Sequence, residues 1–174
     1  SDYKYDLVIE PKMSFGTGHH ETTSMMISFI LANEFTDYSV CDIGSGTGVL
    51  AILAEQRGAN RIDAIDIDNW CYLNSLENIK RNNSKNINIF EGEVEKLMHF
   101  NYDNIFANIN LNVLLNDICI YAKMLNKNGV LYLSGFYKKD INKIEQEARS
   151  SALKLIETKQ ENDWVSLKLS KVSN

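Results

Sequence analysis

The sequence has few cysteines, and their arrangement suggests neither a disulfide framework nor a metal site. Three cysteines occur in 174 residues, at Cys41, Cys71 and Cys119, and no two of them form a CxxC pair. An odd, scattered set among apolar neighbours is typical of reduced thiols in a protein core. We therefore predict a cytoplasmic protein whose three thiols are free and buried.

The sequence also lacks an excess of positive charge and a long apolar run. Its 18 lysines and arginines are outnumbered by 23 aspartates and glutamates, which gives a net charge of -5. A broad nucleic-acid surface needs clustered basic residues, so we expect no direct nucleic-acid binding. No apolar run reaches the roughly 18 residues of a membrane helix, and no signal segment opens the chain, so we expect no membrane association.

What is present fits one α/β domain over residues 1–174. The composition is 44% hydrophobic and 24% charged, which is enough apolar material for a full core. Apolar periodicity predicts strands near 38–43, 61–67, 86–90, 103–108 and 129–134, and helices over 21–35, 48–57, 69–82, 111–126 and 140–150. Strands that alternate with helices form βαβ crossovers, which bury a parallel sheet between two helix layers.

The last part of the sequence follows a different pattern. Apolar Val165, Leu167 and Leu169 alternate with polar residues, a period of two that indicates strands with one solvated face. Two such runs predict an antiparallel hairpin at one edge of the sheet. The predicted fold is therefore Rossmann-like: a doubly wound, seven-stranded sheet, mostly parallel, with an antiparallel C-terminal hairpin and helices on both faces.

A glycine-rich turn joins the first strand of this alternation to the next helix. The stretch "DIGSGTG" places Gly44, Gly46 and Gly48 there. Glycines allow a sharp turn and a close approach of backbone amides to a ligand. Asp66 follows about 20 residues later at the end of the next strand, where a carboxylate accepts the ribose hydroxyls of an adenosine. Together these features predict an adenosine-type cofactor.

The glycine spacing indicates which cofactor binds. The turn reads GxGxG with Asp42 two residues ahead, whereas a dinucleotide-binding turn reads GxGxxG, which opposes a nicotinamide oxidoreductase. The pattern resembles motif I of the class I S-adenosylmethionine methyltransferases, in which the turn passes under the methionine part of the cofactor. The resemblance implies that Asp42, Gly44 and Gly46 contact the cofactor. Asp68 is the rival to Asp66 for the ribose, with helix N-capping as its other interpretation.

Residues after the second and third strands are candidates for the adenine site. Ile67 is predicted either as an apolar wall against one adenine face or as a plain core residue. Glu91 and Glu93, in "EGEVE", lie near the expected position of the adenine amino group, or else are solvated surface residues.

Four segments together resemble one family. The stretches "FGTGHHETT", "DIGSGTG", "AIDID" and "ANINLNVLL" are similar to the catalytic domain of the ribosomal protein L-eleven methyltransferases (PrmA), over about residues 15–135. The resemblance implies that S-adenosylmethionine is the cofactor and that the acceptor is an amine, either lysine or N-terminal, of a large-subunit ribosomal protein. It also implies that Phe15, Gly16 and Thr17 cover the methionine end of the cofactor and that Thr23 supplies a hydroxyl there.

Asn108, at the end of the fourth strand, is the predicted catalytic residue, and it also contacts the cofactor. In "ANINL" it occupies the position where class I amino methyltransferases carry an Asn or Asp. Its side-chain oxygen can accept a hydrogen bond from an amine and orient the lone pair toward the methyl group. Asn110 is predicted to be the N-cap of the following helix.

The paired histidines do not indicate a metal site. Adjacent His19 and His20 seldom converge on one ion, and His99 is remote in the sequence. His20 matches a family position without a role that we can assign.

Two residues depart from the family pattern: Glu21 replaces a proline and His19 a small residue. We further expect that the N-terminal substrate-recognition domain of the family is absent, because 174 residues leave no room for it.

Three alternatives remain open at this point. The same fold supports methylation of RNA or of a small molecule, because function resides in the grafted site. A cofactor-binding module without activity is the third, although the presence of Thr23, Gly44, Asp66 and Asn108 counts against it.

Overall fold

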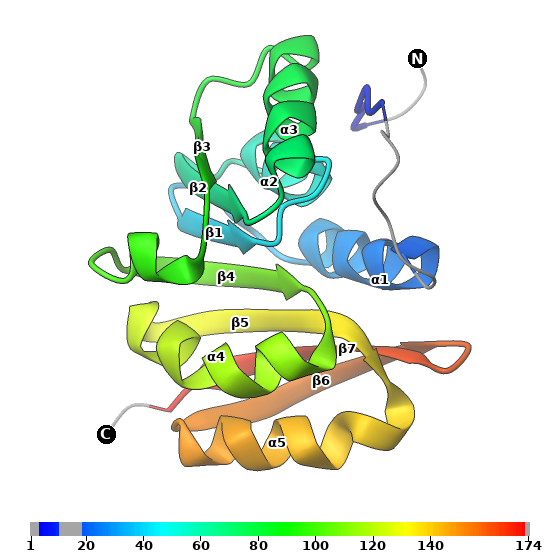
Figure 1. Ribbon diagram of the computed structural model, residues 1–174, viewed down its shortest axis with the longest axis vertical. Coiled ribbons are helices and arrows are strands. Elements are labelled where there is room, and N and C mark those ends of the chain that lie inside the picture. Colours follow the sequence, from blue (N-terminus) through cyan, green and yellow to red (C-terminus); the bar gives the residue numbers. More distant parts are fainter. Residues whose placement is uncertain (1–3, 11–18, 173–174) are drawn as a thin grey trace.

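A seven-stranded sheet runs through the computed structural model, which describes residues 4–10 and 19–172, with the side chain of His19 left out. The strand order is β3-β2-β1-β4-β5-β7-β6, and Figure 1 shows the strands stacked in this order. The strands are β1 (Ser39–Ile43), β2 (Arg61–Asp66), β3 (Ile87–Glu91), β4 (Tyr102–Asn108), β5 (Leu125–Tyr137), β6 (Leu153–Glu161) and β7 (Trp164–Lys171). The first five pair in parallel, and β7 pairs antiparallel with both β5 and β6.

Helices cover both faces of the sheet. They are α1 (His19–Ala32), α2 (Val49–Gln56), α3 (Asn69–Arg81), α4 (Leu111–Met124) and α5 (Ile141–Ser150), with short 3-10 helices η1 (Val94–Leu97) and η2 (Lys138–Asp140). Successive strand residues point to opposite faces, so each strand contributes to two apolar clusters. Val40 packs with residues of α1 and α2, whereas its neighbour Cys41 packs with residues of α4 and α5.

This arrangement confirms the predicted fold class, including the antiparallel hairpin. Some element limits differ from the predictions. α1 begins at His19 and ends at Ala32, and β5 is longer than predicted. β5 extends in both directions because Leu125 pairs with Tyr102 at one end and Tyr137 pairs with Trp164 at the other. Pairing with two neighbours satisfies backbone groups that the sequence pattern placed in the preceding helix, at 125–126, or in loops.

The prediction of three buried thiols is wrong for one of them. All three cysteines are free, and Cys41 and Cys71 are buried, but Cys119 is exposed. The buried stripe of α4 includes Leu114, Ile118 and Tyr121. Cys119 lies about 100° around the helix from Ile118, so it faces solvent.

Within residues 4–10 and 19–172, no helix is both long and apolar enough to cross a membrane.

Candidate functional site

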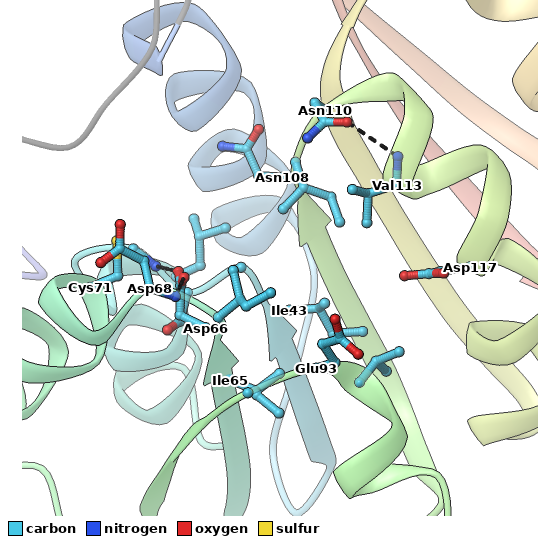
Figure 2. Close-up of a pocket in the computed structure, with 18 of the residues that line it drawn as sticks. Ile43, Ile65, Asp66, Asp68, Cys71, Glu93, Asn108, Asn110, Val113 and Asp117 are labelled. Atoms are coloured by element: carbon cyan, nitrogen blue, oxygen red, sulfur yellow. Dashed lines mark hydrogen bonds between the residues drawn. The ribbon is translucent and has the colours of Figure 1, made fainter.

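A cavity of about 530 Å³ lies at the carboxyl ends of the parallel strands. In doubly wound sheets this edge is where ligands bind. Figure 2 shows Asp66 and Asp68 on one side of the cavity and Asn110, Val113 and Asp117 on the other. The lining comes from α1, β1, α2, β2, α3, η1, β4, α4 and the turns between them: Thr23, residues 43–47, Val49, Leu50, residues 65–68, Cys71, residues 92–95, residues 108–110, Val113, Asn116 and Asp117.

The predicted glycine turn forms the floor of this cavity. Gly44, Gly46 and Gly48 all have positive φ angles, of 71°, 56° and 79°. The amides of Gly44 and Ser45 both donate to the carbonyl of Ile65, at 2.8 and 3.1 Å, which fastens the turn to the end of β2. Gly48 then serves as the N-cap of α2. Left-handed backbone at three positions explains why the turn uses glycine.

Ile109 fits between two glycines, one on each side. A Cβ atom added to Gly44 would overlap Cγ2 of Ile109, and a Cβ added to Gly135 of β5 would overlap the backbone carbonyl of Ile109. Gly135 also has a positive φ angle, of 97°. The cavity wall at Ile109 therefore depends on the absence of side chains at both glycines.

Asp66 lies at the end of β2, as predicted, and its carboxylate holds the turn. One oxygen accepts from the amide of Gly46 and the other from the amide of Asp68, both at 2.9 Å. Asp68 caps α3 by accepting from the amide of Trp70 at 2.8 Å, which confirms its capping role. Both carboxylates line the cavity, but only Asp66 is bonded to the glycine turn.

Asn108 and Thr23 come together across 85 residues of sequence. The side-chain nitrogen of Asn108 donates to the hydroxyl of Thr23 at 3.3 Å, and both residues line the cavity. Two residues later, the side chain of Asn110 accepts from the amide of Val113 at 3.2 Å, which confirms the predicted N-cap of α4. The structure thus places the end of β4 beside α1.

One part of the cavity wall is acidic, because Glu93, Glu95 and Asp117 line it. The pKa of Asp117 lies above its ordinary value. Burial raises it most, a hydrogen bond from Tyr121 opposes this, and the charges of Glu95 and Glu93 raise it further. Sequence reasoning identified Glu93 but missed Asp117.

Of the other two residues predicted near the adenine, Ile67 lines the cavity and Glu91 does not. Glu91 does not line the cavity; it is exposed and accepts a hydrogen bond from Asn69 at 3.1 Å. Ile67 lines the cavity and is 69% exposed, so its alternative interpretation as a core residue is wrong.

Asp42 lies beneath the glycine turn, outside the cavity lining, although we predicted that it contacts the cofactor. It points toward the α1 and α2 side of the sheet, since it alternates with Cys41 and Ile43, and it accepts a backbone hydrogen bond from Ala51 in the first turn of α2. Within the described residues, its Oδ2 atom is buried without a hydrogen-bond partner. Burial raises the pKa of Asp42 to about 7, against the effect of the Ala51 bond.

Three predicted residues of the cofactor cover, Phe15, Gly16 and Thr17, lie outside the described residues. His20 is exposed on α1, and the ring of His99 lies against that of Phe100 with centroids 4.0 Å apart. Over residues 4–10 and 19–172, no three His, Cys, Asp or Glu side chains are grouped so as to hold a metal ion.

Comparison with known proteins identifies the family. The family profile described as "Ribosomal protein L11 methyltransferase (PrmA)" matches residues 2–172. The protein of that name from Bacteroides thetaiotaomicron is 47% identical over 165 residues, which cover 94% of this chain and 59% of the relative. The one from Porphyromonas gingivalis is 44% identical over 168 residues, which cover 96% and 58%.

A solved structure supports the same assignment. The ribosomal protein L11 methylase from Lactobacillus delbrueckii subsp. bulgaricus superposes with a TM-score of 0.84 at 28% identity, over 88% of this chain and 80% of that one. The chain spans 58 to 59% of the length of the two curated relatives above. With a profile match over nearly its whole length, the chain belongs to the ribosomal protein L11 methyltransferase (PrmA) family.

Proposed function

We propose that this chain is the catalytic domain, over residues 1–174, of an S-adenosylmethionine-dependent methyltransferase that acts on a protein amine. The observation that carries the proposal is that one cavity joins the glycine turn, the Asp66 carboxylate and the Asn108 amide. Glycine turn and carboxylate suit an adenosine-type cofactor, and the amide suits an amine acceptor. Relatives named for methylation of ribosomal protein L11 favour a lysine or N-terminal amine of a large-subunit ribosomal protein as the acceptor.

The cavity residues fit this cofactor. Gly44 and Gly46 line the cavity with backbone alone, so the methionine part can lie directly against the turn. Each oxygen of Asp66 already accepts one backbone amide, and a carboxylate oxygen has a further lone pair for a ribose hydroxyl. Ile67 and Glu93 are assigned to the adenine, and Thr23 with Phe15, Gly16 and Thr17 to the methionine end.

Asn108 is the residue that we assign to the acceptor. Because its Nδ2 atom donates to Thr23, the amide is oriented with Oδ1 as the acceptor group. Oδ1 then accepts a hydrogen bond from the amine of the substrate. This bond holds the lone pair of the amine nitrogen in line with the methyl carbon, so Asn108 contributes by orientation. When bound, the cofactor supplies an electrophilic methyl group on its sulfonium.

The acceptor must reach this site without its extra proton. A lysine amine has a pKa of about 10.4 in water and is mostly protonated at neutral pH, and an apolar setting lowers that value. Ile43, Leu50, Ile109 and Val113 supply apolar lining to the cavity. A cytoplasmic location follows from a ribosomal acceptor and is part of the proposal.

The first test is calorimetric titration of the purified chain with S-adenosylmethionine and, separately, with NAD. Binding of S-adenosylmethionine alone supports the proposal, whereas binding of NAD alone contradicts it. Transfer of a radioactive methyl group is then measured with purified large-subunit ribosomal proteins, with ribosomal RNA as a parallel acceptor. Labelling of RNA and not protein would favour the alternative acceptor class, and binding without transfer to any acceptor would favour an inactive cofactor-binding module.

A further inference from the structure

Three asparagines spaced four residues apart line one face of α3. Asn74 and Asn78 are 3% and 0% exposed, and Asn82 follows one turn later at the helix end. A buried amide destabilises a fold unless its hydrogen bonds are made, and asparagine is a poor helix former. This row, which we call the asparagine ladder, therefore has to be explained by its partners.

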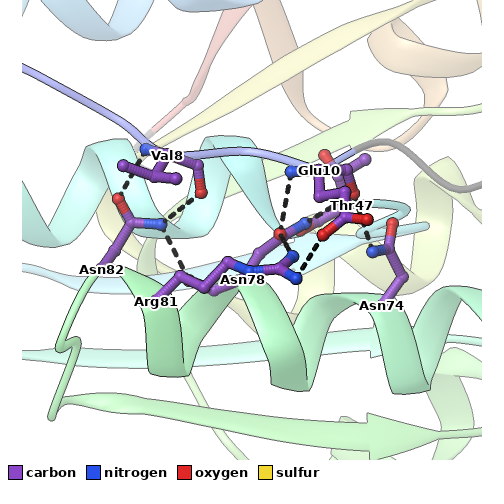
Figure 3. A network of polar contacts seen from close by, with 7 residues as sticks. All are labelled: Val8, Glu10, Thr47, Asn74, Asn78, Arg81 and Asn82. Atoms are coloured by element: carbon purple, nitrogen blue, oxygen red, sulfur yellow. Dashed lines mark hydrogen bonds and ion pairs between the residues drawn. The ribbon is translucent and has the colours of Figure 1, made fainter.

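One set of partners is the extended segment 5–10, which we call the strap. In Figure 3 the strap runs along α3 and the ladder side chains reach its backbone. Val8 exchanges two hydrogen bonds with the amide of Asn82, both at 2.9 Å. The amide of Glu10 donates to Oδ1 of Asn78 at 3.0 Å, and the carbonyl of Glu10 accepts from Asn74 at 2.9 Å.

The strap side chains support the same docking. The side chain of Glu10 pairs with that of Arg81. Tyr5 and Leu7 pack against the apolar cluster under α1 and α2, whereas Asp6, Val8 and Glu10 are exposed. Glu10 precedes the only proline of the sequence, which biases it toward an extended conformation.

The other partner of the ladder is the glycine turn of the cavity. Nδ2 of Asn78 donates to the carbonyl of Thr47 at 3.0 Å. One turn earlier, the hydroxyl of Ser75 donates to the carbonyl of Gly46 at 2.9 Å. α3 thus fixes two carbonyls of the turn that lies under the proposed cofactor.

The orientation of the Asn78 amide is determined by both partners at once. The Glu10 amide is a donor and needs the oxygen, whereas the Thr47 carbonyl is an acceptor and needs the nitrogen. A flipped amide would place two donors together and two acceptors together. If the strap leaves α3, Oδ1 loses the Glu10 amide and retains the longer bond from Nη1 of Arg81, at 3.3 Å, so the Asn78 amide is held less firmly toward Thr47.

We infer that Asn78 is a positioning residue that couples docking of the strap to binding of the cofactor at the glycine turn. The inference rests on the proposed function, since it concerns the affinity for S-adenosylmethionine and its product. Coupling between two binding events is reciprocal: an undocked strap weakens cofactor binding, and a bound cofactor strengthens strap docking to the same degree.

The test compares the dissociation constant for S-adenosylhomocysteine, measured by calorimetry, in three variants. Glu10→Pro removes the N–H that donates to Asn78, together with the side chain that pairs with Arg81. Asn78→Ala removes the hydrogen bonds of its amide to Glu10, Thr47 and Arg81. Each is expected to weaken binding about tenfold, the equivalent of one hydrogen bond in a buried network. Glu10→Ala, which removes the same exposed side chain and keeps the N–H that donates to Asn78, is the matched control and should bind like the wild type.

A second readout separates coupling from loss of folding. Saturating S-adenosylhomocysteine should slow hydrogen exchange of the Glu10 amide in the wild-type chain by about the same factor. If Asn78→Ala does not fold, Glu10→Pro decides, because Glu10 is exposed. Unchanged affinity in folded Glu10→Pro, or unchanged exchange at Glu10, overturns the coupling alone. Failure of the wild-type chain to bind overturns the coupling and the proposed function together.

Discussion

The amide nitrogen of Asn108 donates to the hydroxyl of Thr23, so the end of β4 and the second turn of α1 hold one another at the cavity. This bond distinguishes the two ends of the Asn108 amide: the nitrogen is occupied within the protein, and the oxygen serves as the acceptor. A residue proposed to orient an amine needs such a fixed orientation, because a freely rotating amide would lose it.

Asn108→Ala is expected to lower kcat by about 100-fold and to weaken S-adenosylmethionine binding much less, because the side chain acts on the acceptor. Methyl transfer and calorimetry measure the two quantities separately. Asn110→Ala is the matched control: it removes the N-cap of α4 and should cost about 1 kcal/mol of stability. Equal losses of binding and turnover in Asn108→Ala would contradict its role.

Asp66→Ala should weaken S-adenosylmethionine binding by at least about 100-fold, the effect of losing a charged hydrogen-bonding group and leaving the Gly46 amide without its acceptor. Asp68→Ala removes a neighbouring carboxylate that caps α3, and it should lower the melting temperature while affinity changes little. Calorimetry and thermal unfolding of both variants provide the comparison. The reverse ranking of affinities would assign the ribose to Asp68.

The two glycines beside Ile109 should differ in whether a second substitution rescues them. Gly44→Ala and Gly135→Ala both strain a left-handed backbone at a cost of about 1 kcal/mol or more, and both overlap Ile109. The overlap at Gly44 is with a side chain, so Ile109→Ala should restore part of the stability lost in Gly44→Ala. The overlap at Gly135 is with a backbone carbonyl, and the same change should not rescue it. Urea unfolding of the two glycine variants, each with and without Ile109→Ala, tests this. Equal rescue of Gly44→Ala and Gly135→Ala would contradict it.

Asp42 predicts a particular pH dependence of stability. Its pKa is raised by burial to about 7, above the 3.8 of a free aspartate, so the folded state binds an extra proton between these values. Stability contributed by this group is therefore full near pH 4, falls as the pH rises to 7, and is level above that. The total change is at most roughly 4 kcal/mol at 1.36 kcal/mol per pKa unit.

Asp42→Asn keeps the shape of the neutral carboxyl and removes its titration. Urea unfolding at pH 5 and pH 8 should show a smaller loss of stability with rising pH in this variant than in the wild type. An unchanged pH dependence would show that Asp42 does not carry a raised pKa.

Residues whose position depends on local chain geometry were predictable from the sequence. The glycine turn, Asp66, Asn108 and the Asn110 cap each follow from a strand that ends beside a turn or helix. The outward direction of Cys119 was also within reach, since helical periodicity separates it from the buried Ile118.

Residues that depend on packing between distant elements were not predictable. Asp117 reaches the cavity only because α4 lies over the carboxyl end of the sheet. The bond between Asn108 and Thr23 needs the placement of α1, and the asparagine ladder needs the strap. For Asp42, motif position suggested a cofactor contact, whereas strand alternation directs the side chain toward α2.

The position of β7 between β5 and β6 has a consequence for synthesis on the ribosome. β6 emerges first, yet in the described sheet its strand partner is β7, which is made afterwards. Until β7 inserts, the edge of β5 stays open, and an open edge is a site for wrong pairing with other chains. Trp164 begins β7 and stacks on Tyr137 with ring centroids 4.1 Å apart, so its fluorescence reports the moment at which a nascent chain completes the sheet.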